Sequence, residues 1–156
     1  MEEFSRKLLK FINDNLSNNL IIDLRNNYGG DFFAGLRLAQ ALVLADSLDW
    51  QSGIYVLTNN VTFSAAMSNT AQFKQLLNAK LVGQPTGAKP KGYQDLGEFT
   101  LPNSKRVVTY SKRFYDFLGR DDTAIFPDVM IELSIEDYIN AKDRQLEWIL
   151  KQVNWH

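Results

Sequence analysis

The sequence predicts an α/β fold: a mainly parallel, twisted sheet flanked by helices, with an antiparallel hairpin added to it. Two observations carry this prediction. Between residues 20 and 83, short apolar runs of strand length alternate with longer segments of helical periodicity, which is the pattern of βαβ units with right-handed crossovers. Two strand-like segments then follow each other across a turn of Pro, Asn and Ser, which predicts the hairpin.

The first half of the chain supplies three helices and two strands. Apolar residues at helical spacing predict helices over residues 3–16, 32–45 and 64–77. The strands between them, residues 20–24 and 54–57, are short and strongly apolar. We expect both to be buried strands of the parallel sheet.

The second half begins with a third parallel strand, predicted over residues 80–83. Pro and Gly residues predict a loop over residues 84–92. The hairpin strands are then expected over residues 97–101 and 107–115.

The C-terminal region predicts one more short strand, residues 130–133, and a final amphipathic helix over residues 135–153. Ser134 and Asp137 have the spacing of a capping box, which favours a helix start at that point.

Composition and charge exclude several classes of function. The 156 residues suit a single domain, residues 1–156, and 45% of them are hydrophobic, enough for a sizeable core. Lys and Arg number 17 against 18 Asp and Glu, a net charge of -1, so nothing favours nucleic acid as a partner. No apolar run approaches the roughly 20 residues that span a bilayer, and the charged N-terminus does not resemble a signal peptide. We therefore expect no membrane-spanning segment.

Rare residues restrict the chemistry further. The chain has no cysteine, which removes disulfides, thiol nucleophiles and cysteine-ligated metal sites. Its one histidine is His156, the last residue, so a Ser-His-Asp triad and a histidine-ligated metal cannot be built from this sequence. We expect no cofactor, and lysine is the leading base for any activated serine.

Two loops carry candidate functional groups. Ser64 lies where a strand gives way to a helix, beside N–H groups that favour developing negative charge. It suits a nucleophile, although Thr62 or Ser64 also suits a plain helix N-cap. Gly29 and Gly30 follow the first strand. They permit backbone N–H groups to approach a ligand, and they equally suit a tight turn.

Four segments now line up in order: LIIDLRNNYGG at residues 20–30, VLTNNVTFSAAM at 56–67, AKLVGQPTGAKPKGYQ at 79–94 and FPDV at 126–129. In order and spacing they resemble the catalytic core of the C-terminal-processing, or tail-specific, serine peptidases. The resemblance covers about residues 20–153. It implies a crotonase-like fold and a serine-type endopeptidase, a hydrolase.

The resemblance also implies a role for each matched position. Ser64 matches the attacking serine and Lys89 the lysine that deprotonates it. The backbone N–H of Ala65 and one from Gly29 or Gly30 match the oxyanion donors. Because a lysine in water is protonated at neutral pH, such a dyad requires surroundings that favour the neutral amine of Lys89.

This chain departs from the family pattern at two positions. Met67 stands where the family often has Glu, and Tyr93 where many members have Gln. Gln94, one place further on, can serve as the supporting residue after a small shift of the loop. Lys91 is an alternative base two residues after the matched lysine.

The function that the resemblance implies is hydrolysis of peptide bonds through an acyl-enzyme. Its substrate would be an extended peptide or a protein C-terminal tail, and its location the cell envelope or the exterior. Residues 1–156 would be a single peptidase-core domain, compatible with the C-terminal part of a longer protein, and the oligomeric state stays open. The alternatives are a non-catalytic peptide-binding or scaffold domain of the same fold and, with less support, an acyl-CoA enzyme.

Overall fold

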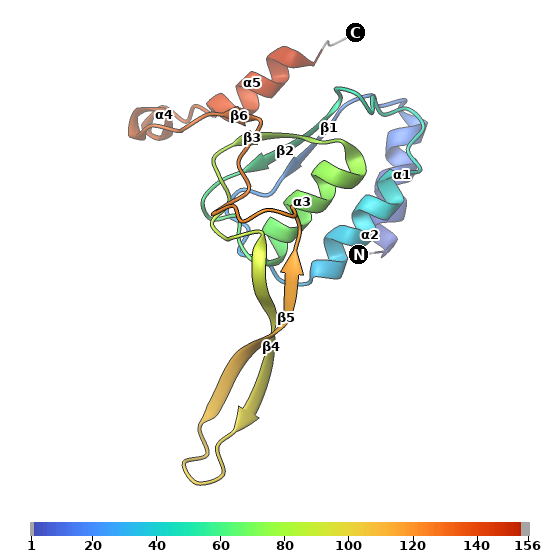
Figure 1. The fold of residues 1–156 in the computed structure, drawn as a ribbon. Helices are drawn as coiled ribbons and strands as arrows, with labels where there is room; N and C mark the ends of the chain where they lie inside the picture. The colour runs from blue at the N-terminus through green and yellow to red at the C-terminus, as the bar shows by residue number, and fades with distance from the viewer. Residues whose placement is uncertain (1, 154–156) are drawn as a thin grey trace.

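The computed structural model describes residues 2–153. Its central element is a four-stranded parallel sheet (Figure 1). Met1 and residues 154–156, which include His156, lie outside the described part. The strands lie in the order β1-β2-β3-β6, and their bounds are β1 Leu20–Asp23, β2 Ile54–Thr58, β3 Lys80–Gly83 and β6 Val129–Met130.

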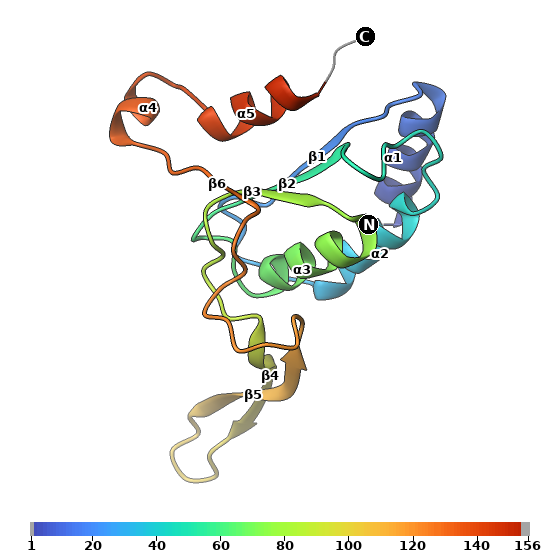
Figure 2. The same cartoon turned by 45° about the horizontal axis from the view of Figure 1, so that its top comes forward.

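Helices cover both faces of this sheet. On one face lie α1 (Glu2–Asp14), α2 (Phe32–Leu42) and α3 (Ala65–Leu77), and on the other lies α5 (Arg144–Gln152) (Figures 1 and 2). Successive residues of a strand point to opposite faces. In β2, accordingly, alternate residues join different cores: Ile54 and Val56 pack in the larger cluster with the first three helices, and Tyr55 and Leu57 pack with α5.

The antiparallel hairpin forms a sheet of its own and projects from the body of the molecule (Figures 1 and 2). Its strands are β4 (Lys91–Thr100) and β5 (Val107–Asp116). The ladder begins with the pair Lys91 and Asp116, so the predicted loop over residues 84–92 is wrong at its end, where residues 91 and 92 belong to β4. Pairing with β5 outweighs the local preference of the glycine-containing segment, because the partner strand satisfies its backbone groups.

The C-terminal region corrects the prediction of one long helix. The chain forms α4 (Ile135–Ile139) and then α5, separated by a turn in which Ala141 has a φ of 50°. Asp143 starts α5 by accepting a hydrogen bond from the N–H of Leu146. The expected capping box of Ser134 and Asp137 is confirmed at the start of α4.

Most other expectations hold, with small shifts of boundary. The mainly parallel sheet flanked by helices, with its hairpin, is confirmed. β2 is fully buried as expected. The expectation that β1 is also buried is wrong: it is an edge strand and only half buried, because it has a partner strand on one side only. The strand expected over residues 130–133 is the two-residue β6. No helix within residues 2–153 is long and apolar enough to cross a bilayer.

This topology determines where a site can form. In parallel strands the carboxyl ends lie at one edge of the sheet, and ligands of α/β proteins bind in the crevice outside that edge. The loops that follow β1, β2 and β3 therefore converge, and they carry the candidate residues of the sequence.

Candidate active site

Ser64 lies at the sharp turn between β2 and α3. It occupies the N-cap position, with φ 50° and ψ −123°, but its side chain makes no cap hydrogen bond. These angles suit Gly far better than a residue with a side chain, and such outliers cluster at functional sites. Ser64 is exposed to solvent, and Thr62 is occupied elsewhere, donating to the carbonyl of Leu24 at 2.8 Å. The hydroxyl of Ser64 is thus exposed and does not cap the helix.

Two backbone N–H groups near this serine have no hydrogen-bond partner among residues 2–153. They belong to Ala65, at the start of α3, and to Gly30. The N–H of Gly29, in contrast, donates to Asn27 Oδ1 at 2.9 Å. Of the two candidate glycines, Gly30 is therefore the one whose donor is available.

Gly29 lies where the loop between β1 and α2 (residues 24–31, the glycine loop) contacts the turn between β2 and α3 (residues 59–64, the serine turn). Its φ is 106°, and a Cβ at this position would lie 2.8 Å from both the nitrogen of Ala65 and the Cβ of Ser64. Only glycine permits so close a contact at that backbone angle. Phe63 joins the same two loops, because its N–H donates to the carbonyl of Asn27 at 3.0 Å.

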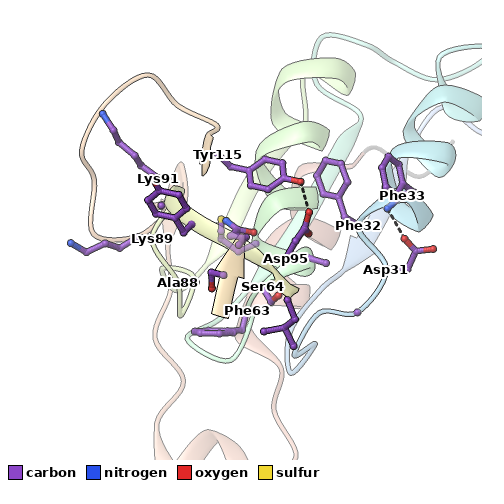
Figure 3. A pocket seen from close by; sticks show the side chains of 18 residues that line it. Asp31, Phe32, Phe33, Phe63, Ser64, Ala88, Lys89, Lys91, Asp95 and Tyr115 are labelled. Carbon is purple, nitrogen blue, oxygen red and sulfur yellow. Dashed lines mark hydrogen bonds between the residues drawn. The ribbon is translucent and has the colours of Figure 1, made fainter. Parts of the chain in front are cut away.

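Lys89 shares a cavity with Ser64 but does not contact it. Both line a cavity of about 760 Å³ together with Gly30 and Ala65. The side chain of Lys89 is exposed and extends away from Ser64 in Figure 3, and no hydrogen bond joins the two. Lys91 also lines the cavity and extends away, and its amine lies 3.3 Å from Asp116. The structure thus places the predicted pair around one cavity without the direct contact of a formed dyad.

Gln94 contacts the helix that follows the serine. It lies on β4 and accepts a hydrogen bond from Ser68 Oγ at 3.2 Å. Ser68 is fully buried, one turn after Ser64 on α3. Met67 is also fully buried and lines the cavity, so an apolar side chain forms this part of the wall. Sequence reasoning missed Ser68, whose only signal was its position one helical turn after the candidate nucleophile.

Aromatic side chains form much of the remaining cavity wall. They are Phe32, Phe33, Phe63, Tyr93 and Tyr115. Tyr115 donates its hydroxyl hydrogen to Asp95 at 2.9 Å and stacks on Phe117 with ring centroids 5.4 Å apart (Figure 3). These residues come from four separate segments, and no sequence pattern groups them.

Ion pairs of Arg25 connect the glycine loop to neighbouring elements. Arg25 follows β1 and contacts Asp23 at 2.7 Å and Asp143 at 2.8 Å. The hydrogen bond with Asp23 is the main reason that the pKa of Arg25 is raised above its ordinary value. The hydrogen bond from Arg25 in turn lowers the pKa of Asp143. The start of α5 is thereby tied to the loop that leads to Gly29.

The arrangement suits acyl transfer. An exposed hydroxyl lies at a helix N-terminus and lines one cavity with two residues whose N–H groups are unpartnered within residues 2–153, and a tetrahedral oxyanion requires donors of this kind. The cavity next to it is large enough for several residues of an extended peptide.

Comparison with known proteins finds a peptidase family and structures of similar fold. The profile of peptidase family S41 matches residues 37–147. A solved candidate peptidase from Parabacteroides merdae has a TM-score of 0.72 at 20% identity, covering 95% of this chain and 56% of its own. A candidate S41 protease from Bacteroides fragilis has a TM-score of 0.65 at 19% identity, covering 96% and 48%.

The photosystem II D1 C-terminal processing protease is also similar, with a TM-score of 0.61 at 24% identity, covering 82% of this chain and 38% of its own. The chain thus spans only about half, or less, of the length of these structures. At such identities the likeness establishes the fold. No curated protein matches the sequence significantly.

Proposed function

Because this chain belongs to peptidase family S41, we propose that it supplies the catalytic core for hydrolysis of peptide bonds, with Ser64 as the nucleophile. The observation that carries the proposal is the conformation of Ser64: an uncapped hydroxyl on a strained turn, beside the free N–H groups of Gly30 and Ala65. Residues 1–156 would form a single peptidase core.

In the proposed reaction, Ser64 Oγ attacks the scissile carbonyl carbon and its proton passes to the neutral amine of Lys89. The carbonyl oxygen becomes an oxyanion held by the N–H groups of Gly30 and Ala65. When the C–N bond breaks, Lys89 returns the proton to the leaving amine, and an acyl ester remains on Ser64. Water, deprotonated by Lys89, then releases the acid and regenerates the serine.

Lys89 must turn toward Ser64 to perform these steps. Its side chain is exposed and has no hydrogen bond or ion pair within residues 2–153, so no bond is lost when it turns. Catalytic contacts in unliganded enzymes are often loose and tighten on substrate binding. Gln94 would support the lysine indirectly, by holding β4 to Ser68 on α3.

The proposed substrate is an extended peptide or a protein C-terminal tail. A peptide lying along the base of β4 can add to the hairpin as a further strand, with main-chain hydrogen bonds giving affinity. The aromatic wall of the cavity provides apolar surface for its side chains. The competing proposal is a non-catalytic peptide-binding domain, favoured by the outward direction of Lys89.

A fluorophosphonate probe separates the two proposals. We expect the wild-type chain to be labelled at Ser64, identified by mass spectrometry of peptides, and Ser64→Ala to remain unlabelled. Lys89→Met should slow labelling by about 10²–10⁴, the usual contribution of a general base. Lys91→Met, a matched change on a lysine of the same loop region, should have little effect. A folded wild-type chain that binds peptides but is not labelled would favour the non-catalytic domain.

A further inference from the structure

A reciprocal pair of hydrogen bonds between Asn26 and Asn59 joins the two loops that carry the unpartnered N–H groups. Asn59, directly after β2, donates from Nδ2 to Asn26 Oδ1 at 2.9 Å. The N–H of Asn26, three residues after β1, donates back to Asn59 Oδ1 at 3.1 Å. The two residues are 33 positions apart in sequence, so this pair is a tertiary contact between loops.

The pair has a fixed orientation. Asn59 Oδ1 also accepts from the N–H of Val61 at 3.1 Å, so two backbone donors determine which side of the amide carries its oxygen. The nitrogen of that amide must then face Asn26. Asn26 itself has a φ of 57°, a left-handed conformation that asparagine tolerates better than most residues. The hydrogen bonds of Asn59 and the backbone angle of Asn26 therefore each favour asparagine at that position.

The position of this pair matters for the site. Asn26 lies four residues before Gly30, and Asn59 lies six residues before Ala65. A second connection, from the N–H of Phe63 to the carbonyl of Asn27, lies closer to the serine. Because the two loops are connected at two places, they cannot rotate about a single hydrogen bond. The Asn26–Asn59 pair and the Phe63–Asn27 hydrogen bond together then determine the distance between the N–H groups of Gly30 and Ala65.

We propose that Asn26 and Asn59 are positioning residues, which hold the N–H groups of Gly30 and Ala65 at the separation that the oxyanion requires. The inference rests on the proposed function of Ser64. Misplacement of a reacting group by about 1 Å can cost roughly 10²-fold in rate, so a connection outside the cavity can govern the reaction.

The decisive variant is Asn59→Asp. Aspartate keeps the acceptor for the N–H groups of Asn26 and Val61 but has no N–H to give, and it turns an oxygen toward Asn26 Oδ1. Asn60→Asp is the matched control: it adds the same charge one residue away, where the side chain has no hydrogen bond within residues 2–153. Asn26→Asp is the conservative variant, because its carboxylate still accepts from Asn59 Nδ2.

The rate constant for labelling of Ser64 by a fluorophosphonate is measured for each folded variant, together with kcat and KM on an extended peptide. We expect Asn59→Asp to lose about 10- to 100-fold in labelling and in kcat, with KM nearly unchanged, since substrate binding does not involve this pair. Asn60→Asp should match the wild type, and Asn26→Asp should keep most of its activity. A general loss of stability would not produce this split between kcat and KM.

Equal rates for Asn59→Asp and Asn60→Asp would overturn the inference while leaving the proposed function intact. A folded wild-type chain that is not labelled at all would overturn the proposed function, and the inference with it. If Asn59→Asp does not fold, Asn26→Ala decides the question, since it removes the acceptor from an exposed side chain. Unchanged labelling of Asn26→Ala would then overturn the inference.

Discussion

At the scale of single residues, Ser64 has an unusual backbone conformation. Its φ of 50° with ψ −123° is the conformation of the first central residue of a type II′ turn, where glycine dominates. A side chain there costs of order 1–3 kcal/mol. The strained backbone therefore lowers stability locally at the proposed nucleophile.

This strain leads to a prediction about two variants of Ser64. In an ordinary helix position glycine is less stable than alanine by roughly 0.5–1 kcal/mol. At Ser64 we expect the reverse, with Ser64→Gly more stable than Ser64→Ala by about 1 kcal/mol, because only glycine relieves the positive φ. Urea denaturation of both variants measures the difference. A Ser64→Ala variant as stable as Ser64→Gly would show that the turn is not strained in solution.

At the scale of elements, the ion pair of Arg25 connects two parts of the fold that are distant in sequence. Arg25 extends from the end of β1 and contacts Asp143, the N-cap of α5, at 2.8 Å. Gln145, fully buried in the first turn of α5, accepts from the same guanidinium at 3.1 Å and donates to the carbonyl of Ile131 at 2.7 Å. α5 is thus attached both to the glycine loop and to the end of the sheet.

The charge of Asp143 should make this attachment depend on pH. The pKa of Asp143 is lowered in the folded chain, chiefly by the hydrogen bond from Arg25. The contribution of the charged carboxylate to folding stability is therefore present above the ordinary carboxyl pKa near 3.9, and it is lost as the pH falls through the lowered pKa. Asp143→Asn keeps an N-cap side chain but removes the charge. We expect it to cost about 1 kcal/mol or less at pH 7, since the carboxylate is 37% exposed and screened.

The measurement is the free energy of unfolding of both proteins between pH 7 and pH 2. The difference between wild type and Asp143→Asn should shrink below about pH 4, as the wild-type carboxyl is protonated. A difference that stays constant over this range would mean that the ion pair contributes nothing and that the two side chains differ only as caps.

At the scale of the whole molecule, periodicity alone predicted the order of the elements and the parallel sheet. It failed where tertiary pairing decides the outcome. β4 begins at Lys91 because its residues pair with the end of β5, although Pro90 and Gly92 favour a loop locally. The expected C-terminal helix divides because Asp143 contacts Arg25 and starts a new helix, a contact between residues 118 positions apart.

The same distinction applies to the site. The turns that follow buried strands suggested Ser64 and the two glycines, but their roles, and that of Lys89, were predicted only from the resemblance carried by the four ordered segments. The Lys89 side chain is exposed and extends away from Ser64, and no sequence pattern encodes that direction. Ser68, which contacts Gln94, and the Asn26–Asn59 pair were missed for a related reason, since each contact joins separate elements.

The two faces of the sheet give the last prediction. The face that packs against α5 carries the smaller core, built around Tyr55, Leu57, Val82 and Ile149. Ile149 is fully buried, whereas its neighbour Leu150 is 36% exposed. We expect Ile149→Ala to lower the free energy of unfolding by about 2–5 kcal/mol, the cost of a cavity in a packed core, and Leu150→Ala to lower it by less than about 1 kcal/mol.

Urea denaturation followed by circular dichroism measures both variants. Leu150→Ala controls for the loss of helix-forming and apolar character on the same helix, so the difference between the two isolates burial against the sheet. If both changes cost equally little, α5 does not pack on β2 and β3 in solution. The attachment of α5 to the glycine loop through Arg25 would then have no rigid base, and the loop near Ser64 would depend on its contacts with the serine turn alone.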